Sequence, residues 1–527
     1  MSWKPSSPPQ YQPVDGPAPG PTPVYAPSYA QPAYGQGEYG QGYGQGGGGY
    51  SGDQKNPYEG ERFKPKKRIN DPIFLILFIA QLVGFIVISV ITLSKFTGDA
   101  GGLGGGVGSG ATGSRITLNY HTAILLLFVT GAALVLSALY LILTRAFTTA
   151  IMHITLVLSI LLNIGIAVYY WITKYYSGAI IFTVIAVISV LAYWGYRSRI
   201  PLAALLLQVV MDVTKHHPSV YVVAFTSLVL QAALSVWYTF TVIATYVRYT
   251  PGSPTCDLGD TCSSAKVTGF IIYETFSFLW TSQVIGNVAL ATLAGGPFGS
   301  WYYFGPREQG LMPKHPTLTS FVRASTLSLG SIAFGSLIVT ILELMRMLLN
   351  AARNSANAEG HPVEACLALC AECFIGCIEG LVQYFNRYAY IEIALYGKPY
   401  LSAAKDTWHL FKDRGIDAIV NDSLVGMTLT WGAYAIGLLC SLFGYLYLRY
   451  THPAYNADGQ YTAPVVLFAF LIGLQSSLTL SSAIEAGVST IFVGLGEDPQ
   501  VLAVRAPALF ALIASTYPDV VRGVPRV

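Results

Sequence analysis

Residues 366–408 read CLALCAECFIGCIEGLVQYFNRYAYIEIALYGKPYLSAAKDTW, a largely apolar run that carries ionisable and amide side chains. If 364–396 forms one helix, residues three and four apart share a face, which predicts a single polar stripe. The stripe consists of Glu379, Gln383, Asn386 and Tyr390, with Arg387 beside it. Ionisable groups in a bilayer usually face a bundle interior or a water-filled path, so these side chains are candidate substrate-binding residues. Hydrogen bonding between helices is the alternative interpretation.

The composition around this stretch indicates a polytopic membrane protein. Of 527 residues, 53% are hydrophobic and only 11% are charged, and the mean hydropathy is +0.50. These values exclude an ordinary soluble globular protein. The predicted fold class is therefore all-α, a bundle of transmembrane helices, and we find no nucleic-acid signature.

A membrane-spanning helix needs about twenty mostly apolar residues, and about ten such runs occur. They are 73–93, 122–143, 148–170, 179–196, 220–247, 267–293, 321–349, 365–396, 424–447 and 464–492. We expect a bundle over 69–496 between an amino-terminal tail, 1–68, and a carboxyl-terminal tail, 497–527. Two further amphipathic stretches, 200–215 and 401–411, are expected to lie at the inner surface and brace the bundle.

Basic residues predict the orientation of the spans. Lys64, Lys66, Lys67 and Arg68 precede the first span, which favours a cytoplasmic amino terminus and contact with anionic membrane lipid. An even number of spans then returns the carboxyl terminus to the cytoplasm. One connection disagrees, because Arg346 and Arg353 fall on the outer side.

The tail is rich in Pro, Gly, Tyr and Gln, a composition that favours disorder. Pro8, Pro9 and Tyr11 form a PPxY motif, which docks in the aromatic groove of WW domains. The tail could thus recruit a WW-domain ubiquitin ligase, although a chance match is the alternative in so biased a segment.

The cysteines do not suggest a metal site. Cys256 and Cys262 lie in a predicted outer loop and are a candidate disulfide. Four more cysteines, Cys366, Cys370, Cys373 and Cys377, repeat on one helix face, where a straight helix cannot surround one ion, so packing against a neighbour is expected. No catalytic motif occurs, and we expect neither an enzyme nor a cofactor.

Intramembrane carboxylates supply the other candidate substrate-binding residues. Glu274 lies beside Tyr273 and near Trp280, and aromatic faces next to a carboxylate suit an organic cation that has no N–H to donate. Glu485 continues a polar face of Gln475, Thr479 and Ser482. Glu343 is expected to pair with Arg346, three residues later. Hydrogen-bonded packing is again the alternative for each.

The segments FVRASTLSLGSIAFGSLIVTILELMR (321–346) and FNRYAYIEIALYGKPYLSAAKD (385–406) resemble the choline transporter-like family. The tail and the segment VSTIFVGLGEDPQVL (488–502) look like its fungal branch, the pH-nine-sensitive proteins. The resemblance implies about ten spans with both ends cytoplasmic. It also implies facilitated movement of choline or a related small organic cation across the plasma membrane.

Two functions therefore stay open. The first is a plasma-membrane solute carrier for a choline-like cation. The second is a non-transporting scaffold or adaptor, in which the tail recruits a ubiquitin ligase and the bundle only anchors it.

Overall fold

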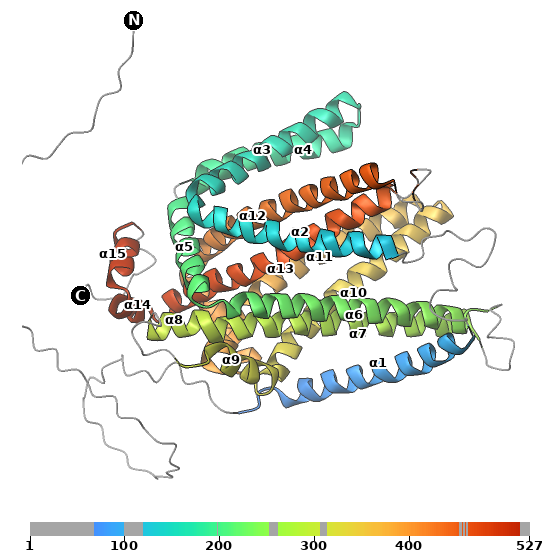
Figure 1. Cartoon of the computed structure of the whole chain (residues 1–527), viewed down its shortest axis with the longest axis horizontal. Helices are drawn as coiled ribbons and strands as arrows, with labels where there is room; N and C mark the ends of the chain where they lie inside the picture. Colours follow the sequence, from blue (N-terminus) through green and yellow to red (C-terminus); the bar gives the residue numbers. More distant parts are fainter. Residues whose placement is uncertain are drawn as a thin grey trace, which may run out of the picture. The chain divides into compact units, whose positions relative to one another are not determined.

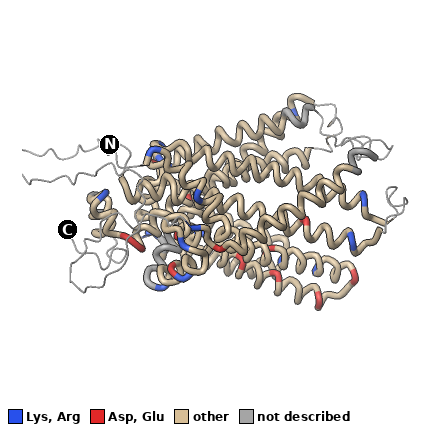
Figure 2. The backbone as a smooth tube through the Cα atoms, turned by 90° about the horizontal axis from the view of Figure 1, so that it is seen from below, with Lys and Arg blue, Asp and Glu red and all other residues tan. Residues whose placement is uncertain are grey.

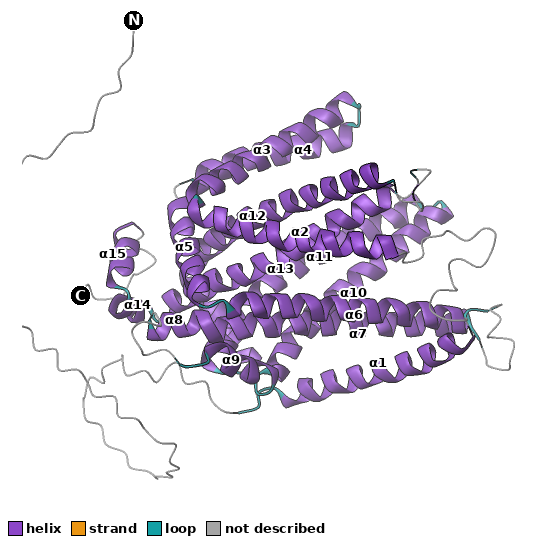
Figure 3. Cartoon of the chain, viewed as in Figure 1, coloured by secondary structure: helices purple, strands orange, loops and turns teal. Residues whose placement is uncertain are grey.

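The computed structural model describes residues 68–99, 120–197, 199–251, 262–305, 313–452, 456, 459 and 462–516. These residues form helices and contain no strand (Figure 3). The PPxY motif at Pro8, Pro9 and Tyr11 and nearly all of the predicted 1–68 tail lie outside them, as does Cys256.

Ten helices in the described part are long and apolar enough to cross a membrane, as predicted (Figure 1). They are α1 (Pro72–Asp99), α2 (Tyr120–Ala146), α3 (Thr148–Ile172), α4 (Tyr176–Tyr196), α6 (Ser219–Tyr249), α7 (Ser264–Leu293), α10 (Leu329–Glu359), α11 (Pro362–Tyr396), α12 (Tyr400–Thr451) and α13 (Thr462–Glu497). The shorter elements are α5 (Ile200–His216), η2 (Ala294–Phe298), α8 (Gly299–Phe304), α9 (Pro316–Ser325), α14 (Pro499–Arg505) and α15 (Pro507–Thr516). Helix α1 begins and helix α13 stops on the same side of the bundle, and we call this side the terminal end.

The seventh span begins later than predicted, because the expected helix over 321–349 is broken near its start. Helix α9 stops at Ser325 and α10 begins at Leu329. Hydroxyl groups explain the break, because Ser325 donates to the carbonyl of Phe321 (2.8 Å) and Thr326 to that of Val322 (2.5 Å). Such side chains compete with the backbone for its hydrogen bonds and favour helix ends. Hydropathy does not detect this competition.

The predicted surface stretch 401–411 is not a separate helix. It is the first part of α12, which runs without interruption over 52 residues. We expected the stretch and the span at 424–447 to be separate helices, but no Pro lies between them, and the helix continues through. The other predicted bracing stretch is α5, whose Leu206, Leu207 and Val210 are fully buried.

The sixth span is interrupted where α7 meets η2. Gly296 has non-helical angles (φ −97°, ψ −106°), and Pro297 follows with no N–H to donate. Helix α9 covers this interruption, since Arg323 Nη2 donates to the carbonyl of Ala394 in α11 (2.8 Å) and lies 3.4 Å from that of Gly295. A Cβ at Gly295 would lie 2.5 Å from Arg323 Nη2, so this approach requires glycine.

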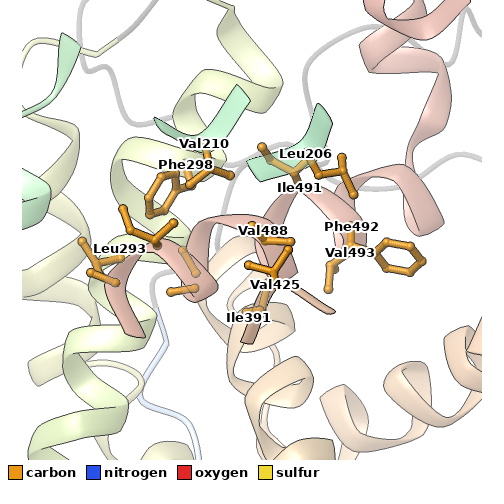
Figure 4. Close-up of a cluster of buried hydrophobic side chains, with 14 of the residues drawn as sticks. Leu206, Val210, Leu293, Phe298, Ile391, Val425, Val488, Ile491, Phe492 and Val493 are labelled. Atoms are coloured by element: carbon orange, nitrogen blue, oxygen red, sulfur yellow. The ribbon is translucent and has the colours of Figure 1, made fainter. Parts of the chain in front are cut away.

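The apolar core is densest near the terminal end, around η2. Figure 4 shows Phe298 of η2 facing Val210 of α5, with side chains of α11, α12 and α13 beside them. The labelled members of this cluster are Leu206, Val210, Leu293, Phe298, Ile391, Val425, Val488, Ile491, Phe492 and Val493. We call this set the apolar plug. Charged residues gather mainly at the two ends of the bundle, and Lys and Arg are densest at the terminal end (Figure 2).

Candidate functional site

A cavity of about 390 Å³ lies inside the bundle, between α6, α7, α10, α11 and α13. Its lining is unusually rich in carboxamides for an apolar bundle: Gln231, Gln283, Asn287, Gln383, Asn386 and Gln475. Ser227, Tyr390, Arg387, Thr479 and Ser482 add further polar groups. Polar side chains inside a membrane bundle are expensive, so their convergence on one space makes this cavity the candidate site.

The predicted polar stripe of α11 both packs and lines the cavity. Gln383, Asn386 and Tyr390 line the cavity, whereas Glu379 does not. Every member also contacts another polar group or a backbone carbonyl. Asn386 Nδ2 donates to the carbonyl of Gly335 in α10 (3.0 Å), and Tyr390 Oη lies 3.4 Å from Ser336 Oγ. The two interpretations of the stripe are therefore compatible.

Glu379 forms an ion pair at the edge of this site. Arg346 Nη1 lies 3.0 Å from Glu379 Oε2, and Gln383 Nε2 donates to Glu379 Oε1 (3.2 Å). We expected Arg346 to pair with Glu343, but α11 supplies the partner. Arg353 likewise pairs with Glu372 of α11 (2.9 Å). The two arginines that disagree with the positive-inside pattern thus each have a neutralising glutamate.

Glu485 is held by a neighbouring helix. Arg387 Nη2 lies 3.2 Å from Glu485 Oε2, and their side chains are 33% and 14% exposed. Arg387 is one of the residues that line the cavity, whereas Glu485 is not. The face that the sequence placed with Glu485 does reach the cavity through Gln475, Thr479 and Ser482.

The structure does not bring Tyr273, Glu274 and Trp280 around one space. Tyr273 Oη donates to the carbonyl of Gln81 in α1 (2.7 Å), and Trp280 Nε1 donates to that of Ala333 in α10 (3.0 Å). Glu274 is fully buried and accepts from Thr245 Oγ1 of α6 at 2.5 Å. Tyr273 and Trp280, seven residues apart, share a face of α7 that packs against α1 and α10, whereas Glu274 faces α6. A substrate-binding role for them stays a prediction.

The apolar plug begins where the cavity lining ends. Leu293 belongs to both, and on α13 the cavity residue Ala486 is followed by Val488 in the plug. On α11, Tyr390 lines the cavity and the next residue, Ile391, lies in the plug. On three helices, residues of the cavity lining are therefore followed toward the terminal end by residues of the plug.

An ionic cluster lies beyond the plug, at the junction of α11 and α12. Lys398 Nζ lies 2.9 Å from the fully buried Glu392 and 2.7 Å from Asp406. Burial opposes the charged form of Lys398, but the two carboxylates more than offset it and raise its pKa above the ordinary value. The ammonium also lies 4.5 Å from the centre of the Tyr396 ring.

The four cysteines of α11 differ from the expectation that they pack against a neighbouring helix. Cys366, Cys370, Cys373 and Cys377 are free and exposed on α11, rather than buried against a neighbouring helix. Cys262 is disulfide-bonded, while its predicted partner Cys256 lies outside the described residues. No cluster of His, Cys, Asp and Glu suited to a metal ion occurs in the part of the chain that is described.

Sequence reasoning missed two parts of the lining. Gln231 and Ser227 of α6 received no role, although a glutamine in the middle of an apolar span was a usable signal. Arg387 was noted only as a neighbour of the stripe. Gln283 and Asn287 lie on the same helix as Tyr273 and Trp280, but only the first two reach the cavity.

Comparison with known proteins gives one consistent result. A model of the plasma-membrane choline transporter family matches residues 180–500. A protein named PNS1 from Cryptococcus neoformans var. neoformans is 62% identical over 477 residues, which cover 90% of this chain and 86% of the relative. PNS1 proteins of Mycosarcoma maydis (44% over 482 residues, 90% and 89% covered) and Candida albicans (39% over 465 residues, 87% and 89% covered) are also similar.

Proposed function

The chain belongs to the plasma-membrane choline transporter family, and on that premise we propose that it carries choline or a related small organic cation by facilitated transport. It is a multi-pass membrane protein of the transporter type. The observation that supports carriage best is the cavity of about 390 Å³ lined by polar side chains from four helices. A bundle that served only as an anchor would have no need of such a lining, because polar groups inside a membrane are costly.

The proposed route starts in the cavity and passes the apolar plug. The buried side chains of the plug follow the cavity lining toward the terminal end, an arrangement that suits one closed state of an alternating-access carrier. The interruption at Gly296 and Pro297 directly precedes Phe298 of this plug, and discontinuous helices form the substrate sites of many carriers. Displacement of Phe298 would then connect the cavity with the terminal end.

We place the terminal end in the cytoplasm and the protein in the plasma membrane. The connections at this end hold Arg145, Arg197, Arg199, Lys314 and Lys405. Excess Lys and Arg in short connections marks the cytoplasmic side. Modification of the tail from inside intact cells, for example by a cytoplasmic biotin ligase, would test this orientation, and labelling only from outside would contradict it.

Uptake of labelled choline into liposomes that contain the purified protein tests the function. A Ser482→Trp variant places an indole in the cavity and is expected to lose uptake. Ser235→Trp is the matched control, because Ser235 is an exposed residue of α6 that does not line the cavity, and it should retain uptake. The proposal fails if the wild-type protein moves neither choline nor ethanolamine faster than empty liposomes leak them.

The carrier and scaffold hypotheses make different predictions for deletion of the tail. Deletion of residues 1–62 should leave uptake per molecule unchanged in a carrier and alter only its turnover. Loss of the cellular role with uptake intact would favour recruitment through Pro8, Pro9 and Tyr11. A Tyr11→Ala variant separates the motif from the rest of the tail.

A further inference from the structure

The charge pair between Arg387 and Glu485 has an unusual position relative to the cavity. The guanidinium belongs to a residue that lines the cavity, and the carboxylate belongs to one that does not. Glu485 is also the less exposed partner, at 14% against 33%. Behind it, Gly426 of α12 approaches, since a Cβ there would lie 3.5 Å from Glu485 Oε1. Arg387 thus both lines the cavity and pairs with the carboxylate.

This arrangement matters for a cation because the remaining polar lining is neutral. Carboxamide and hydroxyl groups offer dipoles, but they cannot neutralise a quaternary ammonium, which also has no N–H with which to use them. Three carboxylates pair with residues that line the cavity: Glu485 with Arg387, Glu379 with Gln383 and Glu343 with Gln283. Of these, Glu485 is the one whose partner in the lining is a cation. A cation in the cavity can reach it only if the guanidinium moves aside.

An unpaired carboxylate would be costly in the empty cavity. Arginine stays charged in proteins, so its guanidinium keeps Glu485 neutralised when no substrate is present. Once displaced, the guanidinium can turn to carboxamide oxygens, and Gln383 lies one helical turn away on the same face of α11. Repulsion between the displaced guanidinium and the substrate favours release, which a carrier needs as much as binding.

We propose that Arg387 is a tethered competitor of the transported cation: it occupies Glu485 in the empty cavity, and substrate ammonium replaces it there. This role rests on the proposed function and makes Arg387 a residue that sets affinity and charge selectivity. A substrate without positive charge cannot displace it. The expected behaviour is opposite to that of an arginine that binds substrate directly.

Direct binding of choline to the purified protein tests this assignment. Arg387→Gln removes the competitor and is expected to lower the dissociation constant of choline about tenfold or more, while Glu485→Gln abolishes detectable binding. The double variant should also not bind. Arg353→Gln is the matched control, since Arg353 pairs with Glu372 and neither residue lines the cavity, and its choline affinity should equal that of the wild type. No variant should bind the uncharged isostere 3,3-dimethylbutan-1-ol more tightly than the wild type does.

The outcomes separate this inference from the proposed function. If the wild type binds choline and Arg387→Gln binds it equally or more weakly, Arg387 is not a competitor, although carriage of choline stands. If neither the wild type nor any variant binds choline or tetramethylammonium, both proposals fall. Should Arg387→Gln not fold, Arg387→Lys keeps the charge but loses the planar fork, and a lower dissociation constant is again expected. An unchanged or higher value would overturn the proposal.

Discussion

The ring of Phe298 lies directly against Gly487, so that a Cβ at Gly487 would be 2.7 Å from the ring atoms Cε1 and Cζ. Phe298 is fully buried in the apolar plug, and Gly487 directly follows the cavity residue Ala486 in α13. A Cβ there would also lie 2.6 Å from Val210 Cγ1 of α5, so the close approach of Phe298 and Val210 to α13 requires glycine at position 487. This contact joins the two elements that close the cavity toward the terminal end.

Replacement of Gly487 by alanine should weaken this closure. The added methyl group would overlap both Phe298 and Val210, and overpacking of this kind costs about 1–3 kcal/mol. The thermal unfolding midpoint of the detergent-solubilised protein is expected to fall. Phe298→Leu in the same chain should restore part of the loss, because the smaller side chain leaves room for the methyl group.

A second glycine provides the control for this experiment. Nothing lies within 4 Å of a Cβ built at Gly269 in α7, so Gly269→Ala should stabilise the helix by roughly 0.5–1 kcal/mol. Equal effects of the two substitutions would show that the contact with Phe298 is unimportant.

Tyr400 is expected to support the cavity wall from outside. Its hydroxyl group lies 2.5 Å from Asn386 Oδ1, and burial raises the pKa of Tyr400 to about 12, so the hydroxyl stays protonated and donates. Tyr400→Phe leaves this buried acceptor without its donor, at a cost of about 1–3 kcal/mol in unfolding free energy. Chemical unfolding of purified protein measures the loss. Tyr450→Phe, at a residue that is 79% exposed, should change the same quantity by less than about 0.5 kcal/mol.

The Lys398 ion pairs should stabilise the protein only below strongly alkaline pH. The pKa of Lys398 is higher in the folded protein than its ordinary value of 10.5. The stabilisation is thus fully present below pH 10.5 and is lost as the pH rises through the folded pKa. Lys398→Met leaves the buried Glu392 unpaired and should cost about 3 kcal/mol at pH 7.

Unfolding midpoints of the wild type and Lys398→Met are accordingly expected to differ at pH 7 and to converge above pH 10.5. Lys405→Met is the control, because Lys405 is exposed on α12, and its effect should stay below about 1 kcal/mol at every pH. A difference at Lys398 that does not depend on pH would mean that packing of the side chain, and not its charge, is what stabilises the junction.

Thiol labelling should distinguish the cavity from the plug. In a background that lacks the five free cysteines, Ser482→Cys lines the cavity, whereas Ile491→Cys is fully buried in the plug. A water-soluble maleimide should react faster at position 482 by about tenfold or more, because reaction requires an accessible thiolate. Choline should slow labelling at 482. Rapid reaction at both positions would contradict a closed plug.

The sequence by itself determined the fold class and the ten spans. Both follow from local quantities, namely the length of each apolar run and the need of every backbone polar group in a membrane for an internal partner. It also determined the stripe of Gln383, Asn386 and Tyr390, because helical periodicity fixes which residues of one helix share a face. The resemblance carried by residues 385–406 likewise pointed to the family that the comparisons show.

Only the tertiary structure decided which of these faces meet. Tyr273 and Trp280 turn to backbone carbonyls of α1 and α10, while Gln283 and Asn287 of the same helix reach the cavity. Arg387 pairs with Glu485 from 98 residues away in the chain. Periodicity gives each side chain a direction around its own helix axis but contains nothing about the neighbour in that direction. The cavity, its plug and its charge pair arise from contacts between helices, and these depend on how the whole bundle packs.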